Sequence, residues 1–301
     1  MARTICIYHA NCADGFTAAW VVREALGAEV EFVPAGYGSE PPDVVGADVV
    51  IVDFSYKRPV IDKMAESARS ILILDHHKTA EAELAGLLRP LRPGWDNHLL
   101  DISGQLVHDV DPRAPRATFD MKRSGAQLAW DFFNAGPREA LIEYVADRDL
   151  WKWELPDSRA VSAWIRSQEM DFDTWSDMAA RLQDEGYDRA AVVGEGEAIL
   201  RAEQKLVGEV LDVTTRMMTI GGYCVPVANA PYALASDTAG RLAEGNPFAA
   251  TYIDTPDGRA FSLRSRAPDG LDVSEIAKLY GGGGHRNAAG FKRALGWEGD
   301  E

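Results

Sequence analysis

Side chains that could bind metal ions follow three short apolar runs near the start of the chain. The donors that follow these runs are carboxylates and imidazoles: His9, Asp14, Asp53, Asp75, His76 and His77. Asp147 offers a further carboxylate in a later segment. Mixed oxygen and imidazole donors suit Mn²⁺ or another first-row divalent ion. A single Asp after a strand is usually a helix cap, and a single His is usually a surface residue, so the prediction rests on their joint occurrence.

Asp53 has a special place in this set because it follows the middle one of the three runs. A carboxylate placed between two ions can bridge them. Two ions about 3.5–4 Å apart can activate water and stabilise both the entering and the leaving oxygen in phosphoryl transfer. We therefore expect phosphoryl chemistry at this edge of the fold.

A second group of residues, near the end of the chain, could bind an anion. The four glycines Gly281–Gly284 let backbone N–H groups approach a ligand, and His285 and Arg286 add side-chain donors. Arg264 and Arg266 stand two residues apart, on one face of a predicted strand, where paired guanidinium groups could bind phosphate. The alternatives are a flexible turn and a solvated edge strand.

The elements that would position the first group alternate between strand and helix. Strands are predicted at Thr4–Tyr8, Val49–Val52 and Ile71–Leu74, and helices at Thr17–Leu26 and Arg58–Ala68. This alternation is typical of an α/β fold with a parallel sheet covered by helices. In such sheets ligands bind beyond the carboxyl ends of the strands, which is where the candidate ligands lie.

The remaining chain divides into a helical part and a second, smaller α/β part. Residues 89–116 read as a long surface loop, with room for a strand. Ser124 and Gln127 have the spacing of a capping box, so a helix is expected to start there. Further helices are expected at Glu139–Val145, 158–185, 189–216, Ser236–Leu242 and Val273–Leu279, and strands at Tyr223–Val227, Phe248–Ile253 and Phe261–Leu263. We expect a catalytic domain over 1–188, a linker helix over 189–218 and a substrate-binding domain over 219–301.

Composition limits the classes of function. The chain has 301 residues, of which 46% are hydrophobic and 26% charged, as in ordinary globular proteins of about two domains. Its net charge of −16 argues against a surface that follows a long nucleic acid, although short anionic substrates could be held locally. Three cysteines and the lack of a long apolar run predict a cytoplasmic protein without a membrane span. Trp151, Trp153 and Trp164 are interpreted as core or domain-interface residues rather than as base-stacking surfaces.

The motifs taken together resemble the DHH phosphoesterase superfamily. The first part matches through Asp75-His76-His77 after ILIL, through HANCADG and VDF before it, and through VADRDLW after it. The tail GGGGHRNAAGF, preceded by FSLRSR, is similar to the DHH-associated substrate-binding domain. The resemblance covers the whole chain in the same order and is closest to compact two-domain members such as oligoribonucleases (nano-RNases).

The resemblance also implies a role for each residue. His9 and Asp53 would bind one ion, and Asp53 would bridge to a second ion bound by Asp14, His76 and Asp147. His77 would contact the scissile phosphate, and Asp75 would orient the neighbouring histidine. Asp149 is the weaker alternative to Asp147, and Cys12 stands where the family usually has an acidic residue, so that a softer ion or a weak first site is expected. The rest of the substrate would be held by Arg264, Arg266, Gly282, Gly283, Gly284 and His285.

These observations predict a hydrolase that needs Mn²⁺ or another divalent ion. It would act as an exonuclease-like phosphodiesterase on short RNA or DNA oligonucleotides or dinucleotides and release nucleoside monophosphates. The alternatives are an exopolyphosphatase, a small-nucleotide phosphatase, or a nucleotide-binding module with weakened catalysis. No membrane partner is expected, and a homodimer is compatible with the sequence.

Overall fold

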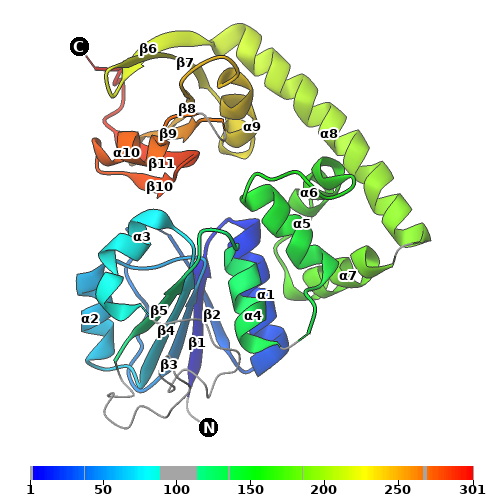
Figure 1. The fold of residues 1–301 in the computed structure, drawn as a ribbon, viewed down its shortest axis with the longest axis vertical. Coiled ribbons are helices and arrows are strands. Elements are labelled where there is room, and N and C mark those ends of the chain that lie inside the picture. Colours follow the sequence, from blue (N-terminus) through cyan, green and yellow to red (C-terminus); the bar gives the residue numbers. More distant parts are fainter. Residues whose placement is uncertain are drawn as a thin grey trace. The chain divides into compact units, whose positions relative to one another are not determined.

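The structure is a computed structural model that describes residues 3–36, 38–88, 114–134, 136–184, 186–266 and 270–300. It divides into two compact units, Met1–Leu200 and Arg201–Glu301, which are considered separately (Figure 1). Most of the predicted surface loop over 89–116 lies outside the described residues. No helix in the described part of the chain is long and apolar enough to span a membrane.

The first unit is built on a five-stranded parallel sheet, which confirms the α/β fold class. Its spatial order is β2-β1-β3-β4-β5, and the strands are β1 (Thr4–His9), β2 (Glu31–Ala35), β3 (Asp48–Val52), β4 (Ser70–Asp75) and β5 (Arg116–Phe119). Strand β2 was not predicted, because Pro34 interrupts a short and largely exposed run. Its place at the edge of the sheet explains why a proline is tolerated there.

Helices cover both faces of this sheet, so its strands are apolar on both sides. In Figure 1, α1 (Ala13–Leu26) and α4 (Gly125–Phe133) lie on one face, and α2 (Arg58–Ala65) and α3 (Lys78–Glu83) lie on the other. Alternate strand residues point to the two layers. The core under α1 and α4 takes Cys6, Val50, Val52, Leu72 and Leu74. The opposite core takes Ile5, Ile7, Val49, Ile51, Ile71 and Ile73.

Four more helices complete the helical part: α5 (Ala140–Asp149), α6 (Ser158–Arg166), α7 (Phe172–Gln183) and α8 (Tyr187–Thr214). The single helix expected over 158–185 is in fact the pair α6 and α7. The break occurs because Asp171 caps a new helix by accepting the N–H groups of Asp173 and Thr174. The division between the two units falls within α8.

The second unit contains a six-stranded mixed sheet with the order β10-β11-β9-β8-β7-β6. Its strands are β6 (Arg216–Ile220), β7 (Tyr223–Asn229), β8 (Ala249–Thr255), β9 (Gly258–Arg264), β10 (Gly283–His285) and β11 (Ala288–Arg293). Helices α9 (Tyr232–Leu242) and α10 (Val273–Lys278) belong to the same unit. Strands β6, β10 and β11 were not predicted. Glycines and alternating polar residues make β10 and β11 difficult to recognise as strands from the sequence. The RMMTI run of β6 fits the end of the preceding helix equally well.

The start of α4 follows the predicted capping box. The hydroxyl of Ser124 accepts the N–H of Gln127 at 3.3 Å, and the Gln127 side chain accepts the N–H of Ser124 at 3.2 Å. We expect Ser124→Ala to lower the free energy of unfolding by about 1 kcal/mol, the usual contribution of such a cap. Urea denaturation followed by circular dichroism would measure it. Ser67→Ala is the control, since that exposed hydroxyl makes only a 3.4 Å hydrogen bond to Met64. Equal effects of the two changes would contradict the expectation.

Candidate metal centre

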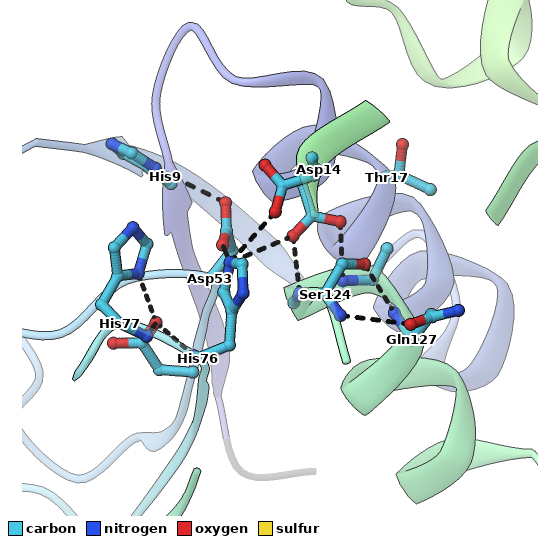
Figure 2. A network of polar contacts seen from close by, with 12 residues as sticks. His9, Asp14, Thr17, Asp53, His76, His77, Ser124 and Gln127 are labelled. Carbon is cyan, nitrogen blue, oxygen red and sulfur yellow. Dashed lines mark hydrogen bonds and ion pairs between the residues drawn. The ribbon is translucent and has the colours of Figure 1, made fainter. Parts of the chain in front are cut away.

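Three neighbouring parallel strands deliver the candidate ligands to one edge of the sheet. His9 ends β1, Asp53 directly follows β3, and Asp75 ends β4. Because β1, β3 and β4 are adjacent in the sheet and point the same way, their carboxyl ends lie side by side. Figure 2 shows His9, Asp53, His76 and His77 gathered there, with Asp14 facing them from the start of α1.

Asp53 lies at the centre of this group. Its Oδ1 atom is 3.0 Å from Nε2 of His76, and its Oδ2 atom is 3.5 Å from Nδ1 of His9 (Figure 2). The residue is buried and has a positive φ of 53°, a conformation that costs a non-glycine residue about 1–3 kcal/mol. Its own N–H donates to the carbonyl of Leu74, which holds this turn against β4. The backbone therefore turns the Asp53 side chain towards both histidines.

Asp14 is held by the first turn of α4. Its carboxylate accepts the N–H of Gly125 at 2.5 Å and the N–H of Ala126 at 3.1 Å. The unpaired N–H groups at a helix start, together with the helix dipole, favour a negative charge. The Oδ2 atom of Asp14 also lies 3.7 Å from Nε2 of His76. Asp14 thus ties helix α4 to the strand ends.

Gly125 is a site residue that the sequence reasoning missed. A Cβ atom at this position would lie 2.4 Å from the Cβ atom of Asp53, which is far closer than real contacts allow. Only glycine lets α4 start this close to the β3 turn. A glycine directly after a capping serine was the available signal, but it is also common at ordinary helix starts.

Asp149 and Asp147 have different surroundings. An Oδ2 atom of Asp149 lies 3.4 Å from Nε2 of His76. Asp147 instead accepts the N–H groups of Glu154 at 3.0 Å and Leu155 at 3.4 Å, and also the hydroxyl of Ser158. Residues two apart on a helix point to different sides, so α5 can present only one of the two carboxylates to the strand ends. The structure brings Asp149, the alternative in the sequence analysis, to this group and holds Asp147 in a turn.

His76 is surrounded by three carboxylates. Burial of the ring opposes protonation, but the nearby charges of Asp149, Asp53 and Asp14 outweigh it and raise the pKa of His76 to about 10. The same crowding also shifts the pKa values of the carboxyl groups. Burial and the charges of Asp53 and Asp149 raise the pKa of Asp14 well above its usual value. Three buried carboxylates around one imidazole are an arrangement that a bound cation would stabilise.

His77 is oriented by Asp75. The Nδ1 atom of His77 is 2.7 Å from Oδ1 of Asp75, which also accepts the backbone N–H groups of His76 and His77 at 2.7 and 3.2 Å. Burial disfavours the Asp75 carboxylate, yet the charge and hydrogen bond of His77 outweigh it and hold the Asp75 pKa below its usual value. This pair fixes the orientation of the His77 ring.

Two overlapping sets of donors could each hold an ion. One is His9, Asp53 and His77, and the other is Asp14, Asp53 and His76; within each set the ligand atoms lie within 4.8 Å of one another. Asp53 belongs to both. The buried Oδ2 atoms of Asp53 and Asp149 accept no hydrogen bond from the described residues, so both remain available to a cation. The oxygen and imidazole donors fit Mn²⁺ or a similar ion.

Cys12 lies at the start of α1 and belongs to neither donor set among the described residues. Burial and the charges of Asp53, Asp149 and Asp14 raise the pKa of its thiol well above the usual value. The protonated thiol therefore adds no negative charge to this group of carboxylates. Its service as a metal ligand stays a prediction.

The predicted anion-binding residues lie in the second unit. Arg264 donates to the hydroxyl of Ser236 at 3.1 and 2.9 Å, and Arg266 pairs with Glu244 at 2.6 Å. Gly282 and Gly284 have a packing role. A Cβ atom at Gly282 would lie 2.0 Å from the carbonyl oxygen of Gly290, and one at Gly284 would lie 2.6 Å from that of Ala288. Gly283 pairs with Gly290 in the β10–β11 hairpin, whose other β10 end is His285. A role of these residues in substrate binding stays a prediction.

Comparisons with known proteins give distant likenesses. No family model matches the chain. The uncharacterized protein R106 of Acanthamoeba polyphaga mimivirus is 26% identical in an alignment that covers 95% of this chain but only 66% of that protein.

Three solved structures are similar over nearly the whole chain. A pGpG-specific phosphodiesterase, PggH, from Vibrio cholerae is 12% identical over 97% of this chain and 94% of its own, with a TM-score of 0.46. A manganese-bound RecJ exonuclease is 15% identical over 97% and 86%, with a TM-score of 0.43. An exopolyphosphatase-related protein from Bacteroides fragilis is 12% identical over 99% and 88%, also with a TM-score of 0.43. Likenesses this weak carry no argument about this chain, so its function must be inferred from its own residues.

Two helical glycines allow a matched test of the close approach at Asp53. We expect Gly125→Ala to destabilise the protein by about 1–3 kcal/mol, because the new methyl group collides with the β3 turn. Gly194→Ala in α8 meets nothing within 4 Å and should stabilise by up to about 1 kcal/mol. Thermal unfolding of both variants measures the difference. The same sign for both changes would contradict the geometry.

A second matched pair separates Asp149 from Asp147. We expect Asp149→Asn to weaken Mn²⁺ binding at least about tenfold while leaving stability nearly unchanged. Asp147→Asn should lower the free energy of unfolding by about 1–3 kcal/mol, because buried donors lose part of their acceptor, and should retain Mn²⁺ binding. Isothermal titration with Mn²⁺ and urea unfolding are the two measurements. Loss of Mn²⁺ binding in a stable Asp147 variant would restore Asp147 as the ligand.

Proposed function

We propose that this chain is a phosphoesterase of the DHH type that requires a divalent metal ion, preferentially Mn²⁺. Its substrates are short oligonucleotides or dinucleotides, which it hydrolyses to nucleoside monophosphates. The observation that carries the proposal is the pair of donor sets that share Asp53, a buried carboxylate between His9 and His76. The motifs HANCADG, VDF, DHH and VADRDLW supply these residues in the order of the resembling family.

Each ligand has a defined part in this proposal. His9 and Asp53 would hold one ion, and Asp14, Asp53, His76 and Asp149 would hold the other. A pair of bound divalent ions supplies Lewis-acid polarisation of the phosphate and activation of water. The α4 start and the β3 turn fix Asp14 and Asp53 before any ion binds, so little rearrangement is needed on binding.

His77 is the side chain in this group best suited to contact the scissile phosphate. Asp75 accepts a hydrogen bond from its Nδ1 atom and fixes the ring, and Nε2 is the nitrogen that would donate a proton or hydrogen bond to a phosphate oxygen. Asp75 itself is fully buried and acts by orienting that ring. Short substrates suit the acidic chain, because a few local donors and ions suffice to hold one or two phosphates.

The proposal is tested with a 5′-labelled RNA ladder of about 2 to 24 nucleotides, incubated with Mn²⁺ or with EDTA. We expect mononucleotides to appear fastest from the shortest species, and only with the metal. Asp53→Asn should abolish most of this activity, since one amide oxygen cannot bridge two ions. Asp62→Asn is the control, because it removes the same charge from an exposed residue of α2 that pairs with Arg58.

An untouched ladder together with orthophosphate release from polyphosphate or small nucleotides would replace the proposed substrate class. An active Asp53→Asn variant would contradict the proposed site. In both cases the Mn²⁺ titration of the variants reports on metal binding separately from turnover.

A further inference from the structure

We propose that Trp151 and Trp153 form a stacking surface for a nucleobase of the substrate, with Arg159 beside them to bind its phosphate. The proposal rests on the proposed function and adds to it the means by which one nucleotide is held. All of the residues belong to the first unit, in the segment that directly follows α5. No contact from the second unit is needed.

The position of the two tryptophans places them near the metal centre. Asp149, the last residue of α5, has its carboxylate 3.4 Å from Nε2 of His76. Trp151 follows two residues later, so its Cα atom lies at most about 7.6 Å from that of Asp149. A base attached to a phosphate at the centre can reach this distance. The surface therefore lies where a substrate nucleotide needs support.

The backbone of this segment is held in an unusual conformation. Trp151 and Trp153 have φ values of 57° and 59°, which large side chains rarely adopt. The N–H groups of Lys152 and Trp153 both donate to the carbonyl of Asp147, at 2.8 and 3.4 Å, and keep the turn closed. Strain of this kind persists where the surrounding structure enforces it and is frequent at functional sites. Here it presents two neighbouring indole rings.

The two rings are not ordinary core residues, so the proposal departs from the interpretation of Trp151 and Trp153 that the sequence favoured. Trp164 is 1% exposed, whereas Trp151 and Trp153 are half-buried. The two rings meet edge to face with centroids 5.1 Å apart. The indole Nε1 of Trp153 is buried and finds no acceptor among the described residues, which is unusual for a buried tryptophan. This N–H is available to a ligand oxygen or nitrogen.

Cations adjoin the rings in a strongly acidic protein. The guanidinium of Arg159 lies 4.3 Å from the centre of the Trp153 ring, and that of Arg148 lies 5.9 Å from both ring centres. Arg123 and Arg138, by contrast, pair with carboxylates of the same unit. Arg159 is exposed, and no ion pair joins it to a carboxylate in the described part of the chain. Stacked on the indole, its donors are free to bind a phosphate.

The first experiment measures binding without catalysis. AMP is titrated into the metal-free protein, and tryptophan fluorescence is recorded. We expect quenching in the native chain and at least about tenfold weaker AMP binding in the Trp151→Leu/Trp153→Leu double variant, because base–aromatic stacking is lost. Trp130→Leu is the matched control, since Trp130 is half-buried in α4 and its Nε1 donates to the carbonyl of Gly136. Equal AMP affinity in the double variant and the control would overturn the proposal.

The second experiment compares the dinucleotide pApA with its analogues that lack one base or the other. The double variant should raise KM about tenfold for pApA, but much less for the analogue lacking the base that stacks. Arg159→Gln, a change at an exposed residue that should leave the fold intact, is expected to raise KM for pApA about threefold to tenfold. Equal effects of the tryptophan changes on all three substrates, or an unchanged KM in every variant, would overturn the proposal. Failure of the native chain to cleave pApA would refute the proposed function, and the AMP titration would still decide on the stacking surface.

Discussion

Repulsion among buried carboxylates is the constraint that organises the first unit. Asp14, Asp53 and Asp149 all approach one nitrogen of His76, at 3.7, 3.0 and 3.4 Å. Such a group is stable only where other charges and dipoles compensate it. The start of α4 compensates Asp14, and the two histidines compensate Asp53, whose pKa they hold well below its usual value against the effect of burial. The arrangement of strand ends, the α4 start and the α5 end follows from this requirement.

The need to compensate the charges of these carboxylates also explains residues that take no part in chemistry themselves. Gly125 allows α4 to approach the β3 turn, and the left-handed conformation of Asp53 brings that turn under the helix. Gly15 serves in the same way, because a Cβ atom there would lie 2.4 Å from the carbonyl oxygen of His9. Close backbone approach, rather than flexibility, is the reason for both glycines. Rigid packing of this kind keeps the carboxylates in place despite their repulsion.

Much of the fold and of the candidate site could be predicted from the sequence, for physical reasons that differ between elements. The strands β1, β3 and β4 are nearly continuous apolar runs because both faces are buried, and such runs are easily recognised. Polar residues directly after them could be assigned to one edge of the sheet. The choice between Asp147 and Asp149 could not be made, because it depends on which side of α5 faces the sheet. Edge strand β2 and the short strand β10 could not be recognised from the sequence, because neither is fully buried and so neither is a continuous apolar run.

The anchoring of Asp14 by Gly125 and Ala126 joins residues more than a hundred positions apart. Asp149, the third carboxylate beside His76, lies about halfway along the chain, so half of the chain must be synthesised before this cluster is complete. A nascent chain that ends shortly after β4 carries His9, Asp14, Asp53, His76 and His77 without the helix start that holds Asp14. The complete set of carboxylates around His76 therefore forms only after α5 has been translated. The order of synthesis thus places formation of the first strands before completion of this cluster.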